Sequence, residues 1–109
     1  MTYKEIYDAL CETDLPVALN FWEKDIPDLP YIVYTIPSNN DFIADNVNYS
    51  EIARIDVGLY TKRKSLTTEK TVETVLTKHF GAFFKSSEWV QSDHLQETIY
   101  TLEVAINGE

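Results

Sequence analysis

The sequence is poor in the residues on which many cofactor sites depend. Its three glycines, Gly58, Gly81 and Gly108, lie far apart. Phosphate-binding loops and dinucleotide fingerprints need clustered glycines that let backbone amides approach the phosphate, so both are excluded. A single cysteine, Cys11, excludes an internal disulfide and a multi-cysteine zinc site. We therefore expect no cofactor.

Histidine is scarce too. His79 and His94 fall in different predicted elements, and their separation matches no common metal-ligand spacing. His79 lies at the end of a predicted helix, where a cation suits the helix dipole, and His94 lies in a predicted turn. The oxygen-bearing residues of segment 39–46 lack the regular spacing and closing glutamate of a calcium loop. The sequence predicts no catalytic residue and no metal site, and hence no enzyme.

Basic residues are outnumbered, nine against eighteen acidic ones, for a net charge of −9. Segment 1–53 has ten acids and two bases, whereas segment 54–109 has eight and seven. An acidic surface repels phosphate backbones, so tight nucleic-acid binding is not expected. No apolar run is long enough for a bilayer, and segment 1–11 lacks the basic start and apolar centre of a signal peptide. These features predict a cytoplasmic protein without a membrane partner.

With 109 residues, 44% of them hydrophobic, the chain is expected to be one globular domain covering residues 1–109. Helical spacing of apolar residues predicts a helix after Thr2, with Tyr3, Ile6, Tyr7 and Leu10 on its buried side. A second helix is predicted between a Ser65 cap and Gly81, with Val72, Val75, Leu76 and Phe80 buried.

Strands are predicted where β-branched and aromatic residues gather or alternate with polar ones. The predicted strands are 17–22, 31–36, 51–62, 83–90 and 96–106. Segment 42–50 is ambiguous and is expected to be an extended excursion or a hairpin arm. Because strands outnumber helices and mostly follow one another, the pattern predicts an α+β fold. Its sheet should be mostly antiparallel, with two helices packed on one face.

Aromatic side chains are abundant, with seven tyrosines, five phenylalanines and two tryptophans. Aromatics are enriched where proteins meet proteins, and Trp22 and Trp89 fall outside the clearest buried stripes. Each tryptophan alone is more simply explained by packing back onto the sheet. The predicted oligomer or partner interface is the polar excursion with its apolar residues: Asn39, Asn40, Asp41, Phe42, Ile43, Asp45, Val47 and Tyr49. A basic contact patch is considered at Lys62, Arg63 and Lys64, although three adjacent cations are more often a solvated loop.

Several stretches together resemble small tail-completion proteins of long-tailed bacteriophages and prophages. They are Leu15-Pro16-Val17 through Phe21, Pro30-Tyr31-Ile32-Val33-Tyr34, segment 39–46, Ile55-Asp56-Val57-Gly58-Leu59-Tyr60-Thr61, and Ile99-Tyr100-Thr101-Leu102-Glu103-Val104. The family is the tail-terminator or head–tail joining type, similar in kind to the lambda U protein. The resemblance covers nearly the whole chain, and its motifs include no catalytic signature.

The resemblance implies a protomer that closes into a ring, commonly a hexameric one, on the last layer of the tail tube. The implied partners are other copies of the chain, the tail tube protein, and the head connector or other neck proteins. DNA would pass through the lumen without specific binding. The protein would act in the bacterial host cytoplasm during assembly and remain at the neck or tail end of the virion. Two alternatives stay open: another neck protein, such as a head-completion or connector-stopper protein, and an acidic regulatory module that binds a basic partner.

Overall fold

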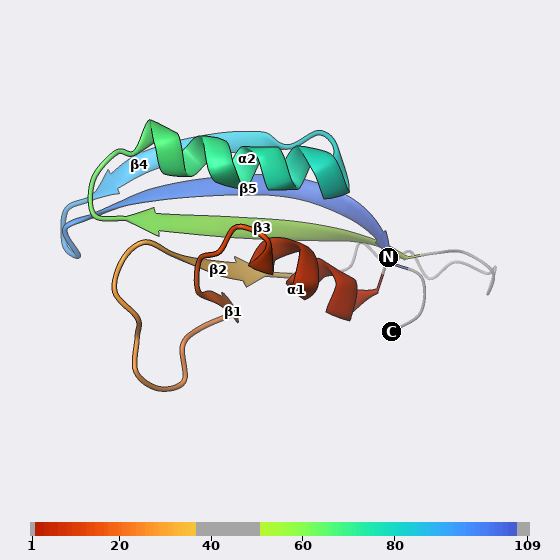
Figure 1. The fold of residues 1–109 in the computed structure, drawn as a ribbon, viewed down its shortest axis with the longest axis horizontal. Coiled ribbons are helices and arrows are strands. Elements are labelled where there is room, and N and C mark those ends of the chain that lie inside the picture. The colour runs from red at the N-terminus through yellow and green to blue at the C-terminus, as the bar shows by residue number, and fades with distance from the viewer. Residues whose placement is uncertain (1, 37–50, 107–109) are drawn as a thin grey trace.

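The computed structural model describes residues 2–36 and 51–106, which form two helices and one five-stranded sheet (Figure 1). In chain order the elements are α1 (Tyr3–Cys11), β1 (Val17–Leu19), β2 (Tyr31–Thr35), β3 (Glu51–Thr61), α2 (Leu66–Phe80), β4 (Phe84–Val90) and β5 (Leu95–Ile106). The expected α+β class is confirmed.

The strands lie in the order β1-β2-β3-β5-β4. Only β1 and β2 are parallel; the other neighbouring pairs are antiparallel, so the sheet is mixed but mostly antiparallel. The long strands β3 and β5 form its centre and pair from Glu51–Ile106 to Thr61–Gln96. This order leaves β1 at one edge and β4 at the other.

Local sequence signals explain both helix starts. At α1, the Thr2 hydroxyl accepts a hydrogen bond from the Glu5 amide at 3.2 Å, and the Glu5 carboxylate accepts one from the Thr2 amide at 2.7 Å. At α2, the Ser65 hydroxyl accepts a hydrogen bond from the Thr68 amide at 3.3 Å. Gly81 ends α2 with φ +85°, a conformation that suits glycine. The predicted caps are confirmed.

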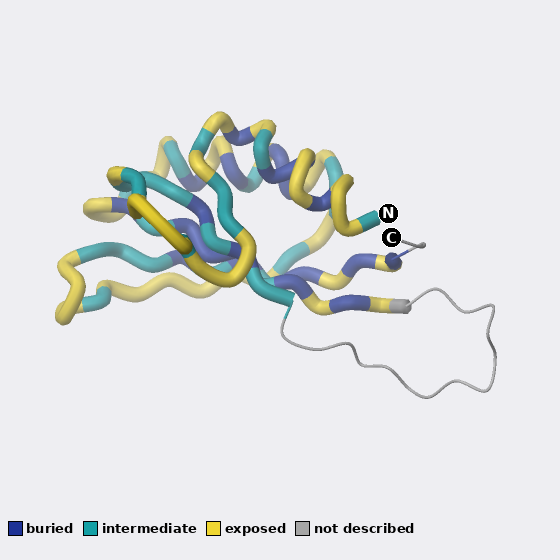
Figure 2. The backbone as a smooth tube through the Cα atoms, turned by 90° about the horizontal axis from the view of Figure 1, so that it is seen from below, coloured by how far each residue is buried: buried dark blue, intermediate teal, exposed yellow. Residues whose placement is uncertain are grey.

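The core lies between the helices and one face of the sheet. Figure 2 shows both helices on the same side of the sheet, with buried residues along the helices and along the strands next to them. The fully buried large aliphatic residues come from α1, α2, β2 and β3: Ile6, Leu10, Ile32, Ile55, Leu59 and Leu76. Burying such a side chain contributes about 1.5–3 kcal/mol, so this layer supplies most of the drive to fold. No described helix covers the opposite face of the sheet.

Some details differ from the prediction. β1 ends at Leu19 rather than residue 22, because Asn20 has φ +68° and turns the chain away from the sheet. Tyr3 and Tyr7 are 38% and 42% exposed, since the helix buries Ile6, Ala9 and Leu10 instead. The sequence had predicted Tyr3 and Tyr7 on the buried side of this helix. The ambiguous segment 42–50 lies outside the described residues.

Candidate assembly surface

The two edge strands are the first places to look for a contact with another protein. An edge strand carries backbone N–H and C=O groups that have no neighbour within the sheet. β4 is seven residues long, and β1 only three. The β4 edge therefore offers much the longer row of backbone groups.

The β4 edge carries exposed apolar side chains. Phe84 is 82% exposed and Trp89 is 45% exposed, and Leu66 at the start of α2 is 70% exposed. Large apolar groups this open are common at surfaces where proteins meet. The neighbouring Phe83 turns the other way and packs edge-to-face on Tyr100, with ring centroids 5.2 Å apart. One phenylalanine of the pair thus belongs to the core and the other to the surface.

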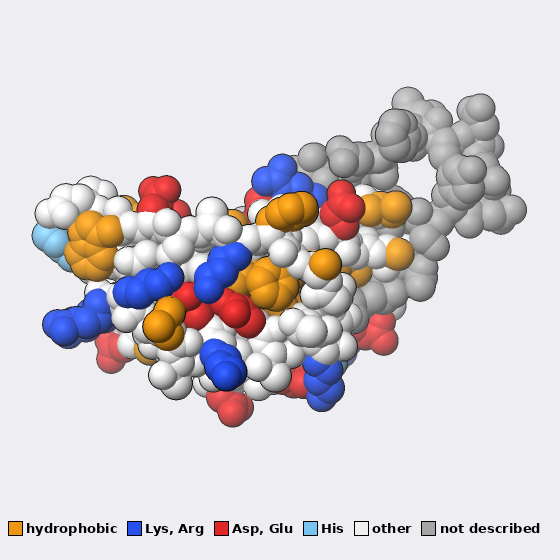
Figure 3. Space-filling view, turned by 90° about the horizontal axis from the view of Figure 1, so that it is seen from above, with side chains coloured by type: hydrophobic (Ala, Val, Ile, Leu, Met, Phe, Trp, Pro, Cys, Tyr) orange, Lys and Arg blue, Asp and Glu red, His pale blue; other side chains and the backbone are white. Residues whose placement is uncertain are grey.

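A lysine–carboxylate cluster joins this edge to α2. Glu69 is almost completely buried, with 2% of its side chain exposed. Its carboxylate forms ion pairs with the ammonium groups of Lys85, at 2.8 Å, and Lys64, at 3.0 Å. Lys85 also reaches Glu73 at 2.7 Å, and the Tyr100 hydroxyl donates to the Glu73 carboxylate at 2.8 Å. Figure 3 shows acidic groups surrounded by basic and hydrophobic side chains on this side of the molecule.

The cluster shifts the titration of its members in the directions expected of a structural network. Burial by itself would raise the pKa of the Glu69 carboxyl, but hydrogen bonds from Lys85 and Lys64 outweigh burial and hold that pKa below the ordinary glutamate value. The same bonds, to Glu69 and then Glu73, raise the pKa of Lys85. Burial, followed by the bond to Glu73, raises the pKa of Tyr100 well above that of free tyrosine. Both carboxylates are paired with lysine, so the cluster ties α2 to β4 and to the β3–α2 connection.

The predicted basic patch divides into two parts. Lys64 belongs to the cluster, and its ammonium also lies 3.5 Å from the Ser87 hydroxyl of β4. Lys62 and Arg63 are exposed, and within the described residues neither forms an ion pair. Because Lys64 ties the β3–α2 connection to β4, these two free cations lie beside the β4 edge. Trp89 pairs with Gln96, next to Thr61 and these cations, whereas Phe84 pairs with Thr101 towards the other end of β4. We call the β4 edge with Lys62, Arg63, Phe84 and Trp89 the basic edge; Glu88 is its one exposed acid.

The other sheet edge carries the opposite charge. The loop from Asn20 to Pro30 joins β1 to β2 and projects beyond β1 (Figure 1). Its exposed apolar residues are Phe21, at 64%, and Ile26, at 68%. Its acids Glu23, Asp25 and Asp28 are exposed and form no ion pair among the described residues, and they outnumber the one base of the loop, Lys24. Phe21, Ile26 and the three acids form what we call the acidic edge.

The acidic edge is anchored to the sheet. Trp22 packs edge-to-face on Tyr31 with centroids 5.8 Å apart, and Tyr31 lies 5.5 Å from Tyr60 on β3. At the start of the loop, the Asn20 amide donates a hydrogen bond to the Tyr34 carbonyl of β2 at 2.8 Å. Trp22 therefore folds back as its simpler interpretation predicted, which leaves Phe21 and Ile26 directed outward from a fixed base.

The histidines and the cysteine do not form a reactive site. His79 Nε2 lies 3.0 Å from Glu12 Oε1, and Lys78 lies 3.4 Å from the same oxygen, which ties α2 to α1. Hydrogen bonds from His79 and then Lys78 lower the pKa of Glu12. His94 is exposed in the β4–β5 turn, as predicted, and Cys11 is partly buried and free. The described residues contain no group of three potential metal ligands, and neither described helix is long and apolar enough to cross a bilayer.

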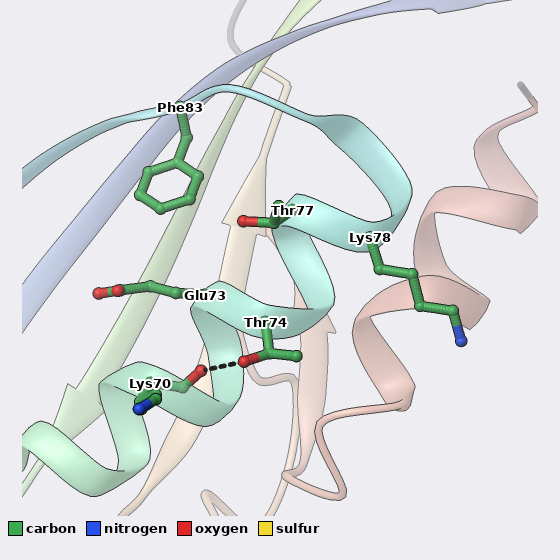
Figure 4. Close-up of a pocket in the computed structure, with 6 residues that line it drawn as sticks. All are labelled: Lys70, Glu73, Thr74, Thr77, Lys78 and Phe83. Carbon is green, nitrogen blue, oxygen red and sulfur yellow. Dashed lines mark hydrogen bonds between the residues drawn. The ribbon is translucent and has the colours of Figure 1, made fainter.

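A depression of about 470 Å³ lies along α2 and is wide open to solvent. It is lined by Lys70, Glu73, Thr74, Thr77, Lys78 and Phe83 (Figure 4). In Figure 4 Lys78 points away from the other labelled side chains, towards α1, and the Thr74 hydroxyl is engaged with the Lys70 carbonyl at 2.8 Å. The side chains do not converge on one point, so the depression lacks the geometry of a small-molecule site.

Of the predicted contact residues, the structure places only the basic patch of Lys62, Arg63 and Lys64. Segment 39–49 lies outside the described residues, so its role stays a prediction. The outward Phe84, Phe21 and Ile26 were not singled out from the sequence. Phe84 could have been, because adjacent strand residues point to opposite faces, so only one of Phe83 and Phe84 can enter the core. Phe21 and Ile26 carry no comparable signal, since loop periodicity does not indicate burial.

Comparison with known proteins bears on the fold. No protein family matches the chain, and no curated protein resembles it closely in sequence. A solved structure does match: a chain of the virion of a native gene transfer agent particle, with a TM-score of 0.66 at 10% sequence identity. The match covers 94% of this chain and 92% of that one, so the two share a fold over nearly their entire lengths.

Proposed function

We propose that this protein is a non-enzymatic structural component of a phage-like virion and acts as a tail terminator or head–tail joining protein. The fold shared with a chain of a gene transfer agent virion carries the proposal. Because the match spans both chains almost completely, it concerns the whole domain and not a common supersecondary motif.

The surface supports an assembly role. Both sheet edges expose large apolar side chains, and the acid-rich cluster on α2 is internally neutralised. Such a molecule is suited to binding other proteins through its edges. In the proposed role, copies form a ring at the end of the tail tube, bind the tube protein on one side and meet the head connector on the other. DNA passes through the ring without specific contacts.

Deleting the gene from its phage or prophage tests the proposal. Loss of a terminator removes the stop signal for the tube, so electron microscopy of induced lysates should show tails of uneven and excessive length. Expression of the intact gene in trans should restore uniform tails. Normal tails beside heads that leak DNA would instead identify a head-completion or connector-stopper protein.

Fractionation gives an independent test. Purified particles should contain the protein at the neck, detected by mass spectrometry and antibody labelling. Absence from particles, together with a salt-sensitive complex with a basic host protein, would overturn the proposal in favour of the acidic regulatory module.

A further inference from the structure

We infer that the basic edge of one copy binds the acidic edge of the next copy, so that the subunits join head to tail through opposite edges of their sheets. This inference rests on the proposed ring and names the surfaces that would build it. Each edge belongs to a different strand at opposite ends of the order β1-β2-β3-β5-β4. A single chain therefore carries both halves of the contact.

Charge is the first reason to choose a second copy as the partner. Lys62 and Arg63 have no ion pair within the described residues, and neither do Glu23, Asp25 and Asp28. Most other described cations are engaged within the chain, as Lys4, Arg54, Lys64, Lys78 and Lys85 show. Opposite charges left unmatched on two separate edges complement each other between copies.

Apolar exposure is the second reason. Phe84 and Trp89 lie on the basic edge, and Phe21 and Ile26 lie on the acidic edge. Both edges therefore combine large apolar groups with an excess of charge of one sign, although Glu88 lies on the basic edge and Lys24 in the acidic loop. The excess is positive on one edge and negative on the other, which favours a head-to-tail contact over a two-fold dimer. Contacts of that kind close into rings when the rotation between subunits allows it.

Charge reversal with a mixing step tests the inference. The first variant is Lys62→Glu/Arg63→Glu, which makes both edges acidic. The second is Glu23→Lys/Asp28→Lys, which makes both basic; Asp25 is left alone because its φ of +38° suits few other residues. Each variant alone should self-associate at least about tenfold more weakly than the wild type in sedimentation velocity, because like charges then meet. An equal mixture of the two should recover assembly, since each basic edge again faces an acidic one.

A matched control separates this effect from net charge. Lys4→Glu/Arg54→Glu makes the same charge change as the first variant, on side chains that are 81% and 54% exposed and lie off both edges. It should assemble like the wild type, and circular dichroism should show all variants folded. Assembly of both edge variants at the wild-type level would overturn the inference and leave the proposed ring intact. A wild-type chain that never self-associates, even on tail tube ends, would overturn the ring and this contact together.

Discussion

At the scale of single residues, Glu69 is the most constrained charged group described. It lies on the inner side of α2, with 2% of its side chain exposed, yet it is held ionised by lysines from two other segments. A buried carboxylate is costly unless it is paired and hydrogen-bonded; here two lysines pair with it, although Oε2 has no hydrogen-bond partner. The residue therefore stabilises one arrangement of α2 against β4.

Glu69→Gln should lower the free energy of unfolding by about 2 kcal/mol at neutral pH, the scale of a hydrogen bond to a charged group. The loss is limited because Lys85 keeps Glu73 as a partner. Urea unfolding followed by fluorescence measures it. Glu103→Gln, on an exposed residue of β5, is the matched control and should change stability by less than about 0.5 kcal/mol.

The pH dependence follows from the direction of the Glu69 shift. Its folded-state pKa lies below the ordinary value, so its contribution to stability is present above the unfolded pKa and is lost as pH falls through the folded pKa. The stability gap between the wild type and Glu69→Gln should therefore narrow on acidification. A gap that stays constant down to acidic pH would show that the ionised carboxylate contributes nothing.

At the scale of elements, α2 is the larger of the two described helices and fixes β4 as well as covering the core. Its inner face presents Val72 and Leu76, both fully buried, while Leu66 at its start is 70% exposed. One helix thus offers the same residue type in two opposite environments.

Leu76→Ala should destabilise the fold by about 2–5 kcal/mol, because it removes a buried side chain and leaves a cavity. Leu66→Ala makes the same chemical change on the surface and should cost less than about 0.5 kcal/mol. Thermal and urea unfolding of the two variants measure the difference. Equal losses would mean that α2 does not pack on the sheet through the face described.

The cap of α2 gives a second prediction for this element. Ser65→Ala removes the side-chain acceptor for the Thr68 amide and should cost about 1 kcal/mol, whereas Ser65→Gly should cost only a few tenths. Urea unfolding of both variants at one pH provides the measurement. A smaller loss for alanine than for glycine would be inconsistent with the capping role.

The elements also show what the sequence could and could not predict. Caps and alternation act over a few residues, so Ser65, Gly81 and the buried face of Ile55, Val57 and Leu59 were foreseeable. The parallel pairing of β1 with β2 was not, because pairing depends on long-range packing. The burial of Glu69 was not foreseeable either. Its lysine partners come from residues 64 and 85, and no local pattern links them.

At the scale of the whole molecule, the important feature is the separation of charge between two sheet edges. The basic edge and the acidic edge flank the same sheet, each with exposed apolar groups beside its charges. Contacts of this composition combine a screened electrostatic part with an apolar part that salt does not weaken.

Two measurements should separate those parts. Raising sodium chloride from about 0.05 M to about 0.5 M shortens the Debye length several-fold and should weaken self-association without abolishing it. Phe84→Ser should weaken self-association at both salt concentrations while leaving monomer stability within about 0.5 kcal/mol, because the side chain is 82% exposed. Sedimentation velocity across the salt series gives the first result and urea unfolding the second. Self-association that is unchanged by both salt and Phe84→Ser would contradict a contact through this edge.

The pairing of β3 with β5 has a consequence for biosynthesis. β3 cannot complete its hydrogen-bonded ladder on that side until β5, the last strand described, has been translated and has left the ribosome. Until then one edge of β3 lacks its hydrogen-bonding partner, and the nascent polypeptide is open to aggregation. A truncated product that stops within β5 should therefore be a substrate for chaperones and proteases, and only full-length chains would be delivered in folded form.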